Sequence, residues 1–147
     1  QMLVRFRADV LALKPRLVVL LAGTNDIAGN TGKASVDEIA GHLRSMVQLA
    51  RAEGVRVVLC LVLPVKAYPW NPEVRPVPQV AALNRQLQAL ARQYGAGWVD
   101  YFSPLADSEK GLPQAYSGDG VHPNDAAYRV MRGLVDPAIA QQLRPHD

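Results

Sequence analysis

The sequence predicts an α/β fold in which helices cover both faces of a parallel sheet. The runs 16–22 and 55–65 are rich in Val and Leu and do not alternate with polar residues, as is typical of strands buried on both faces. Around these runs, apolar residues recur at helical spacing. Because strand and helix patterns alternate along the chain, we expect a three-layer α/β/α sandwich with the sheet in the middle.

Size and composition favour a single domain and exclude several classes of protein. The 147 residues, 49% of them apolar, are enough for one core, so we expect one domain over 1–147. A net charge of +3 with interspersed acids and bases lacks the basic stripe of a nucleic-acid-binding protein. No run approaches the roughly 20 apolar residues of a membrane span. The lone Cys60 lies in an apolar run, so we expect no disulfide and a thiol in the core.

The order of the elements follows from apolar spacing and from residues that begin or end helices. Proline cannot continue a helix, so Pro15 marks the end of the first one. Ser35 and Glu38 match a capping box that begins the second helix, and Gly54 ends it in a left-handed turn. These signals place helices over 2–13, between Ser35 and Gly54, over 80–94 and after Asn124 or Asp125, strands over 16–22, 55–65 and 97–102, and a frayed tail over 141–147.

The loop 66–78 is the least regular stretch and contains Tyr68, Trp70 and four prolines. A stiff loop with aromatic side chains at the carboxyl end of a sheet can line a substrate pocket, which makes Tyr68 and Trp70 candidate substrate contacts. A packed spacer between two elements explains the same composition. Both interpretations stay open at this point.

Two polar corners follow predicted elements. The segment 23–26, Gly-Thr-Asn-Asp, comes directly after the first strand, where open α/β sheets place their ligands. An Asx turn that only closes the strand would use the same residues. Far along the chain, Asp119 and His122 lie three positions apart. A carboxylate that binds one ring nitrogen of a histidine fixes its tautomer, so this pair has the chemistry of an oriented general base.

With these two segments in this order, the chain resembles the SGNH (GDSL-like) serine esterases. The segment 23–26 is similar to their Gly-x-Asn-Asp block, and 119–122 is similar to their Asp-x-x-His block. The resemblance implies a flavodoxin-like sandwich, His122 as general base oriented by Asp119, and Asn25 as an oxyanion-hole donor, with no metal and no cofactor. In that family an early Gly-Asp-Ser motif carries the nucleophile and a second block adds an oxyanion-hole glycine. The chain has neither, so we expect it to be roughly the later two thirds of a family domain, with the serine upstream of Gln1.

The function expected from this resemblance is hydrolysis of a small-molecule, carbohydrate or lipid ester by the parent protein. We expect short acyl groups, because no long exposed apolar stripe is visible, and we expect 1–147 alone to be inactive. Two other classes stay open: a non-catalytic binding module on the same scaffold, and a metal-dependent phosphoesterase with Asp26, Asp119 and His122 as ligands. The localisation also stays open, because Gln1 is not a natural start.

The strand 17–21 has an edge that needs a partner. In a flavodoxin-like sheet of order 2-1-3-4-5 it would be the third strand, normally paired on both sides. The strand consists of Val and Leu alone, so it has none of the charged residues or prolines that protect an exposed edge. We therefore expect this edge to pair with a missing N-terminal segment, with a second copy of the chain edge to edge, or by strand exchange.

Overall fold

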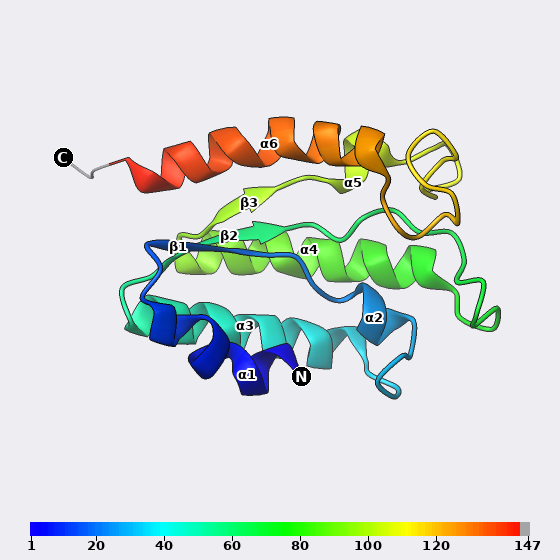
Figure 1. The fold of residues 1–147 in the computed structure, drawn as a ribbon. Coiled ribbons are helices and arrows are strands. Elements are labelled where there is room, and N and C mark those ends of the chain that lie inside the picture. The colour runs from blue at the N-terminus through cyan, green and yellow to red at the C-terminus, as the bar shows by residue number, and fades with distance from the viewer. Residues whose placement is uncertain (145–147) are drawn as a thin grey trace.

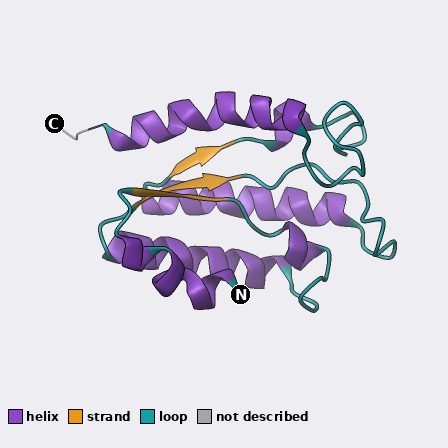
Figure 2. Cartoon of the chain, viewed as in Figure 1, coloured by secondary structure: helices purple, strands orange, loops and turns teal. Residues whose placement is uncertain are grey.

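The computed structural model describes residues 1–144, which form a three-layer α/β/α sandwich (Figure 1). The elements in chain order are α1 (Met2–Asp9), a 3-10 turn (Leu11–Leu13), β1 (Leu17–Leu20), α2 (Thr24–Ile27), α3 (Val36–Ala52), β2 (Arg56–Cys60), α4 (Pro76–Tyr94), β3 (Gly97–Val99), α5 (Phe102–Leu105) and α6 (Asp125–Leu143). The three strands are parallel and lie in the order β1-β2-β3. Figure 2 shows the sheet between helix layers, which confirms the predicted fold class.

Each face of the sheet is covered by its own hydrophobic core. Side chains of α1, α3 and α4 pack on one face, together with Val57 and Leu59 of β2. Side chains of α5 and α6 pack on the other face, together with Val58 and Cys60. Successive β2 residues therefore enter opposite cores, which explains why this strand shows no alternation of apolar and polar residues.

The predicted boundary of the second helix is confirmed. The Ser35 hydroxyl accepts a hydrogen bond from the Glu38 amide at 3.2 Å, and the Glu38 carboxylate accepts from the Ser35 amide at 2.7 Å. At the other end Gly54 has φ of 72°, the left-handed conformation that glycine adopts without strain. Local interactions alone fix both ends of α3.

The first helix is shorter than predicted. Continuous α-helix ends at Asp9, and the tighter 3-10 turn follows it. This change of pitch turns Leu11 into the core and leaves Leu13 exposed. The prediction of one helix over 2–13 was therefore wrong at its end, because apolar spacing does not distinguish the two kinds of turn.

The prediction of a frayed tail was also wrong for its first residues. Gln141, Gln142 and Leu143 complete α6, and the Arg56 guanidinium donates hydrogen bonds to the backbone carbonyls of Gln142 and Arg144. This contact from β2 satisfies carbonyls that have no partner within the helix. The rest of the predicted tail, 145–147 with His146, lies outside the described residues.

All three strands are shorter than predicted. β1 covers only Leu17–Leu20 of the predicted range 16–22. β2 ends at Cys60 although 61–65 stay buried, and β3 ends at Val99 because Phe102 already begins α5. Beyond β2, the Asn84 side chain of α4 accepts from the Val62 amide at 2.7 Å and donates to its carbonyl at 3.0 Å. Asn84 thus replaces a neighbouring strand at this position. The Asn84 side chain is buried by this contact.

Cys60 lies in the core, as predicted. Its side chain is buried, and burial raises the pKa of the thiol from 9.0 to about 11. A thiol with so high a pKa forms little thiolate at neutral pH, so it is a poor nucleophile.

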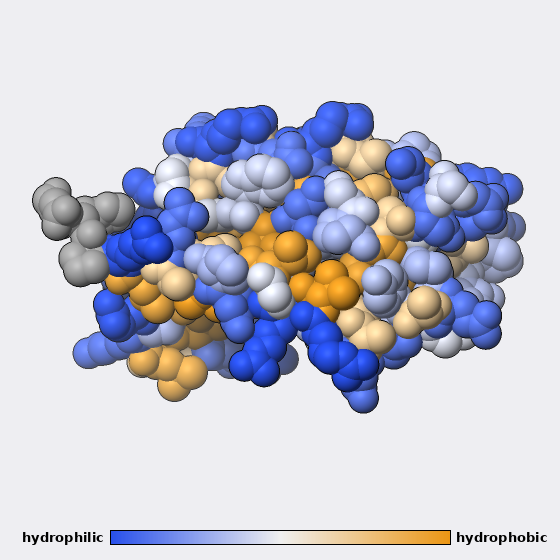
Figure 3. All heavy atoms as spheres, turned by 90° about the horizontal axis from the view of Figure 1, so that it is seen from above, coloured by the Kyte–Doolittle hydropathy of each residue, from blue (hydrophilic) through white to orange (hydrophobic). Residues whose placement is uncertain are grey.

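Part of the surface is apolar. Among the described residues β1 pairs only with β2, and Val19 and Leu21 are each 38% exposed along this edge. Figure 3 shows apolar side chains gathered near the middle of one face and bordered by hydrophilic ones. Within 1–144, none of the helices has the length and apolar character required to cross a membrane.

Candidate active site

Asp119 and His122 form a directly hydrogen-bonded pair in the loop before α6. The Nδ1 atom of His122 lies 2.6 Å from Oδ2 of Asp119. The other carboxylate oxygen accepts hydrogen bonds from the backbone amides of His122 and Val121, at 2.8 and 2.9 Å, and from the Ser117 hydroxyl at 3.0 Å. These bonds, that from the His122 side chain first, hold the pKa of the Asp119 carboxyl well below its usual range. The carboxylate is therefore ionised at neutral pH and holds the imidazole by Nδ1.

The loop that carries this pair is anchored at the start of α6. The Asn124 side chain accepts hydrogen bonds from the amides of Ala126 and Ala127, so it is the N-cap of the helix. Its amide group donates to the Ala115 carbonyl at 3.1 Å, and its backbone amide donates to the Tyr116 carbonyl at 2.9 Å. His122 therefore lies two residues before a fixed helix terminus.

Asn25 lies at the carboxyl end of β1, in the short helix α2. Gly23 begins this helix with φ of 119°, and a side chain added there would meet Leu83 at 2.7 Å. The Ile27 amide donates to the Gly23 carbonyl, so the segment forms a helical turn and the alternative of a simple Asx turn does not hold. The Oδ1 atom of Asn25 accepts a hydrogen bond from Nδ2 of Asn30 at 3.2 Å. Within the described residues, Nδ2 of Asn25 makes no hydrogen bond.

The two aromatic residues of the loop 66–78 differ in their surroundings. Tyr68 is fully buried, its hydroxyl donates to the Thr24 carbonyl at 3.1 Å, and burial raises its pKa to about 12. The prediction of Tyr68 as a substrate contact was therefore wrong: the residue supports α2 from the core. Trp70 is exposed, with its ring centroid 6.0 Å from that of His122 and 5.4 Å from that of Tyr68. Its indole Nε1 donates to Oδ1 of Asn30 at 2.9 Å.

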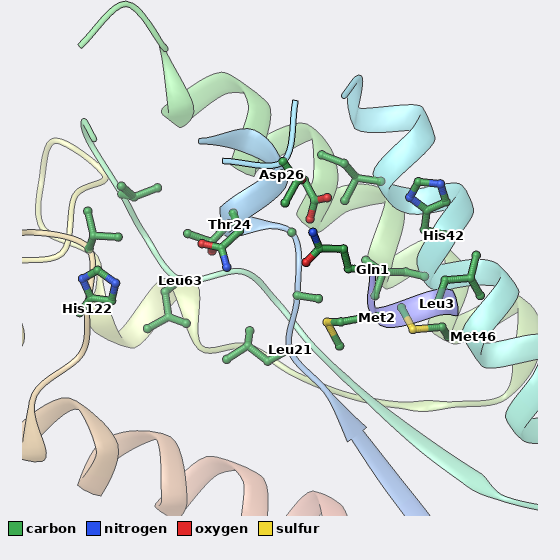
Figure 4. A pocket seen from close by; sticks show the side chains of 18 of the residues that line it. Gln1, Met2, Leu3, Leu21, Thr24, Asp26, His42, Met46, Leu63 and His122 are labelled. Atoms are coloured by element: carbon green, nitrogen blue, oxygen red, sulfur yellow. The ribbon is translucent and has the colours of Figure 1, made fainter. Parts of the chain in front are cut away.

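Asn25 and His122 line the same cavity of about 470 Å³ at the carboxyl ends of the strands. Figure 4 shows the His122 ring at one end of the cavity and His42 of α3 at the other, with Leu21 and Leu63 between them. Much of the apolar lining comes from α1, α3 and the segments that follow β1 and β2: Met2, Leu3, Leu21, Leu43, Met46, Leu63 and Val65. The structure thus brings the two predicted polar corners, nearly 100 residues apart in sequence, to one site.

None of the serines lines this cavity. Ser35 is a helix cap, Ser45 donates to the Gly41 carbonyl within α3, and Ser103 donates to the Asp100 carboxylate. Ser117 is buried and bound to Asp119. In the part of the chain that the structure describes, Asp26, Asp119 and His122 do not form a cluster of metal-binding side chains, and neither does any other group of three.

The fold is that of an α/β sandwich whose cavity, at the carboxyl ends of parallel strands, holds an Asp–His pair and an Asn side chain. The chain belongs to the GDSL-like lipase/acylhydrolase family, which it matches over residues 1–130. This match agrees with the resemblance inferred from segments 23–26 and 119–122.

Individual relatives agree with this membership. The chain is 36% identical over 142 residues to the esterase TesA of Pseudomonas aeruginosa, covering 96% of the chain and 64% of that protein. It is 30% identical over 128 residues to a GDSL lipase of Mycobacterium tuberculosis, covering 86% of the chain and 51% of that protein. The chain thus spans about half to two thirds of the length of these two relatives.

Solved structures give the same result. A GDSL-like lipase from Bacteroides thetaiotaomicron superimposes with a TM-score of 0.92 at 40% identity, covering 96% of the chain and 70% of that protein. A Bacteroides fragilis protein provisionally assigned as an acylhydrolase gives 0.93 at 46% identity, with 97% and 69% covered.

Sequence reasoning missed two residues of the site, Asn30 and Ser117. Ser117 lies two positions before Asp119, and its hydroxyl accepts from the Asp119 amide as well as donating to the carboxylate. Asn30 lies in a glycine-rich loop, where polar residues are common and carry no specific signal. Only its contacts in the folded chain distinguish it.

Proposed function

We propose that the parent protein hydrolyses esters through a serine nucleophile that lies outside residues 1–147, and that this chain supplies the general base and one oxyanion donor. The observation that carries the proposal is the 2.6 Å contact between Asp119 and His122 at a cavity that Asn25 also lines. Membership of the GDSL-like lipase/acylhydrolase family supports it. The absence of any serine from the cavity lining favours a nucleophile from elsewhere.

In the proposed reaction, Nε2 of His122 takes the hydroxyl proton as the serine oxygen attacks the ester carbonyl carbon. Asp119 holds the imidazole by Nδ1 and stabilises the imidazolium that forms. Asn25 donates through Nδ2 to the oxyanion, a contact typically worth about 3 to 4 kcal/mol of barrier. The imidazolium then protonates the leaving alcohol, and a water molecule repeats the sequence to release the acid.

We further propose that the free edge of β1 and the apolar cavity beside it are covered in the parent protein by an additional polypeptide segment, or by a second copy of the chain. The exposure of Val19 and Leu21 supports this proposal, because an unprotected edge of apolar residues favours strand addition. A stable monomer of 1–147 in light scattering, with rapid amide exchange along β1, would contradict it.

The proposed substrates are esters with short acyl groups. If a polypeptide segment fills the apolar part of the cavity, little room is left near His122 for a long chain. One relative, 26% identical over 151 residues and matching 30% of its own length, is an acetylxylan esterase of Xylanibacter ruminicola. The acyl length is tested by comparing acetyl with octanoyl esters of the same alcohol.

The decisive experiment uses the full-length protein, an activated acetate ester and a serine-directed phosphonate. We expect turnover that the phosphonate abolishes, a loss of at least about 10⁴-fold in kcat for His122→Ala, and a smaller loss for Asn25→Ala. Residues 1–147 alone should give no turnover. A full-length protein that binds esters without hydrolysing them would favour a non-catalytic binding module instead.

A further inference from the structure

The proposed role of Asn25 depends on which way round its side-chain amide lies. Nδ2 donates a hydrogen bond and stabilises an oxyanion, whereas Oδ1 in the same place would repel it. The two ends of the amide have almost the same shape, so the backbone of α2 does not choose between them. Some other group must fix the orientation.

We propose that Trp70 fixes the orientation of the Asn25 amide through Asn30, which makes Trp70 and Asn30 positioning residues. An indole N–H can only donate a hydrogen bond. Because Nε1 of Trp70 lies 2.9 Å from the Asn30 side chain, the atom facing it must be the acceptor, Oδ1. The Nδ2 atom of Asn30 then faces Asn25 at 3.2 Å, so the facing atom of Asn25 is Oδ1 and its Nδ2 is left for the oxyanion.

The same tryptophan lies next to the base. Its ring centroid is 6.0 Å from that of His122 with an interplanar angle of 32°. One side chain therefore contacts the histidine and sets the direction of the amide donor. A separate hydrogen bond, from Asn71 to the Ala28 carbonyl at 2.9 Å, joins the same two loops without touching Asn25. This bond provides a matched control for loop anchoring.

The inference rests on the proposed role of Asn25, and Asn30→Asp tests it most sharply. An aspartate at position 30 still accepts from Trp70 but cannot donate to Asn25, so the Asn25 amide turns and presents Oδ1 to the site. In the full-length enzyme we expect a fall in kcat of about 100-fold, similar to that of Asn25→Ala, with KM nearly unchanged. Asn30→Ala frees the amide without turning it. Since water competes at these exposed side chains, its loss should be only about 3- to 10-fold.

Double variants distinguish a change in the orientation of the Asn25 amide from a general disturbance of the site. In an Asn25→Ala background there is no amide to turn, so Asn30→Asp and Asn30→Ala should each change kcat by less than about twofold. Asn71→Asp places the same charge on the neighbouring loop, and its effect should be equal in both backgrounds. Trp70→Phe keeps a ring beside His122 but removes the donor, so it should match Asn30→Ala.

Two results would overturn the inference: an Asn30→Asp enzyme as active as Asn30→Ala, or losses that persist in the Asn25→Ala background. If Asn25→Ala itself leaves kcat unchanged, the proposed function of Asn25 fails, but this result does not test the relay, the chain of hydrogen bonds from Trp70 through Asn30 to Asn25. The relay is then read from the side-chain amide resonances of Asn30 and Asn25 in the full-length protein. Trp70→Phe should shift both, and unchanged resonances would contradict the relay.

Discussion

The two polar corners of the site are held in opposite ways. At the first corner, every hydrogen bond to the Asp119 carboxylate comes from residues at most three positions away. At the other corner, the Asn25 side chain accepts a hydrogen bond from Asn30, which in turn accepts one from Trp70, 40 residues further along the chain. The proposed base is therefore held by its own segment of sequence, whereas the proposed oxyanion donor, Asn25, is held through the contact of two loops.

A large effect, approaching that of His122→Ala, should come from breaking the Asp119–His122 corner with Asp119→Asn. The amide keeps much of the local geometry but loses the charge that stabilises the imidazolium, and it can hold the histidine in the wrong tautomer. We expect kcat of the full-length enzyme to fall about 10³- to 10⁴-fold, with little change in KM. Ester-hydrolysis kinetics measure this directly. A loss of less than tenfold would mean that Asp119 does not orient the base.

A smaller effect should follow Asn84→Ala, which removes the hydrogen bonds that hold the segment after β2. The buried amide and carbonyl of Val62 would lose their partners, at about 1 to 3 kcal/mol each. We expect the free energy of unfolding to fall by about 2 to 6 kcal/mol, measured by urea denaturation, while kcat of the folded enzyme changes little. Arg85→Ala, at the next and exposed position, is the control. Equal stability of the two variants would contradict the assigned role of Asn84.

The smallest effect is a difference in pH dependence between the Asp119–His122 corner and the Asn25 corner. The folded-state pKa of Asp119 is lowered, so the bonds to its carboxylate contribute stability above the ordinary value of 3.8 and are lost as pH falls through the lower folded value. The amide resonances of Val121 and His122 should therefore titrate with a midpoint below 3.8. The Asn30 side-chain resonance should not follow, because the relay from Trp70 contains no titratable group. A midpoint at or above 3.8 would contradict the arrangement.

The sequence by itself determined the features that depend on near neighbours in the chain. The capping box of Ser35 and Glu38, the cap at Asn124 and the Asp119–His122 pair all join residues at most three positions apart, so a short segment specifies them. Buried strands were also readable, because a strand covered on both faces needs apolar residues throughout. These signals predicted the fold class and the Asp119–His122 pair.

Only the tertiary structure decided how distant loops use their side chains. Tyr68 and Trp70 are separated by one residue, yet one is buried under α2 and the other lies exposed beside His122. Both are aromatic residues of the same loop, so the composition of the loop does not distinguish them. Which of the two is buried depends on the elements that pack against the loop. The same holds for Asn30 and Asn84, polar residues whose partners lie in other elements. A hydrogen bond across 20 to 40 residues leaves no local pattern, since chain folding and not spacing brings its donor and acceptor together.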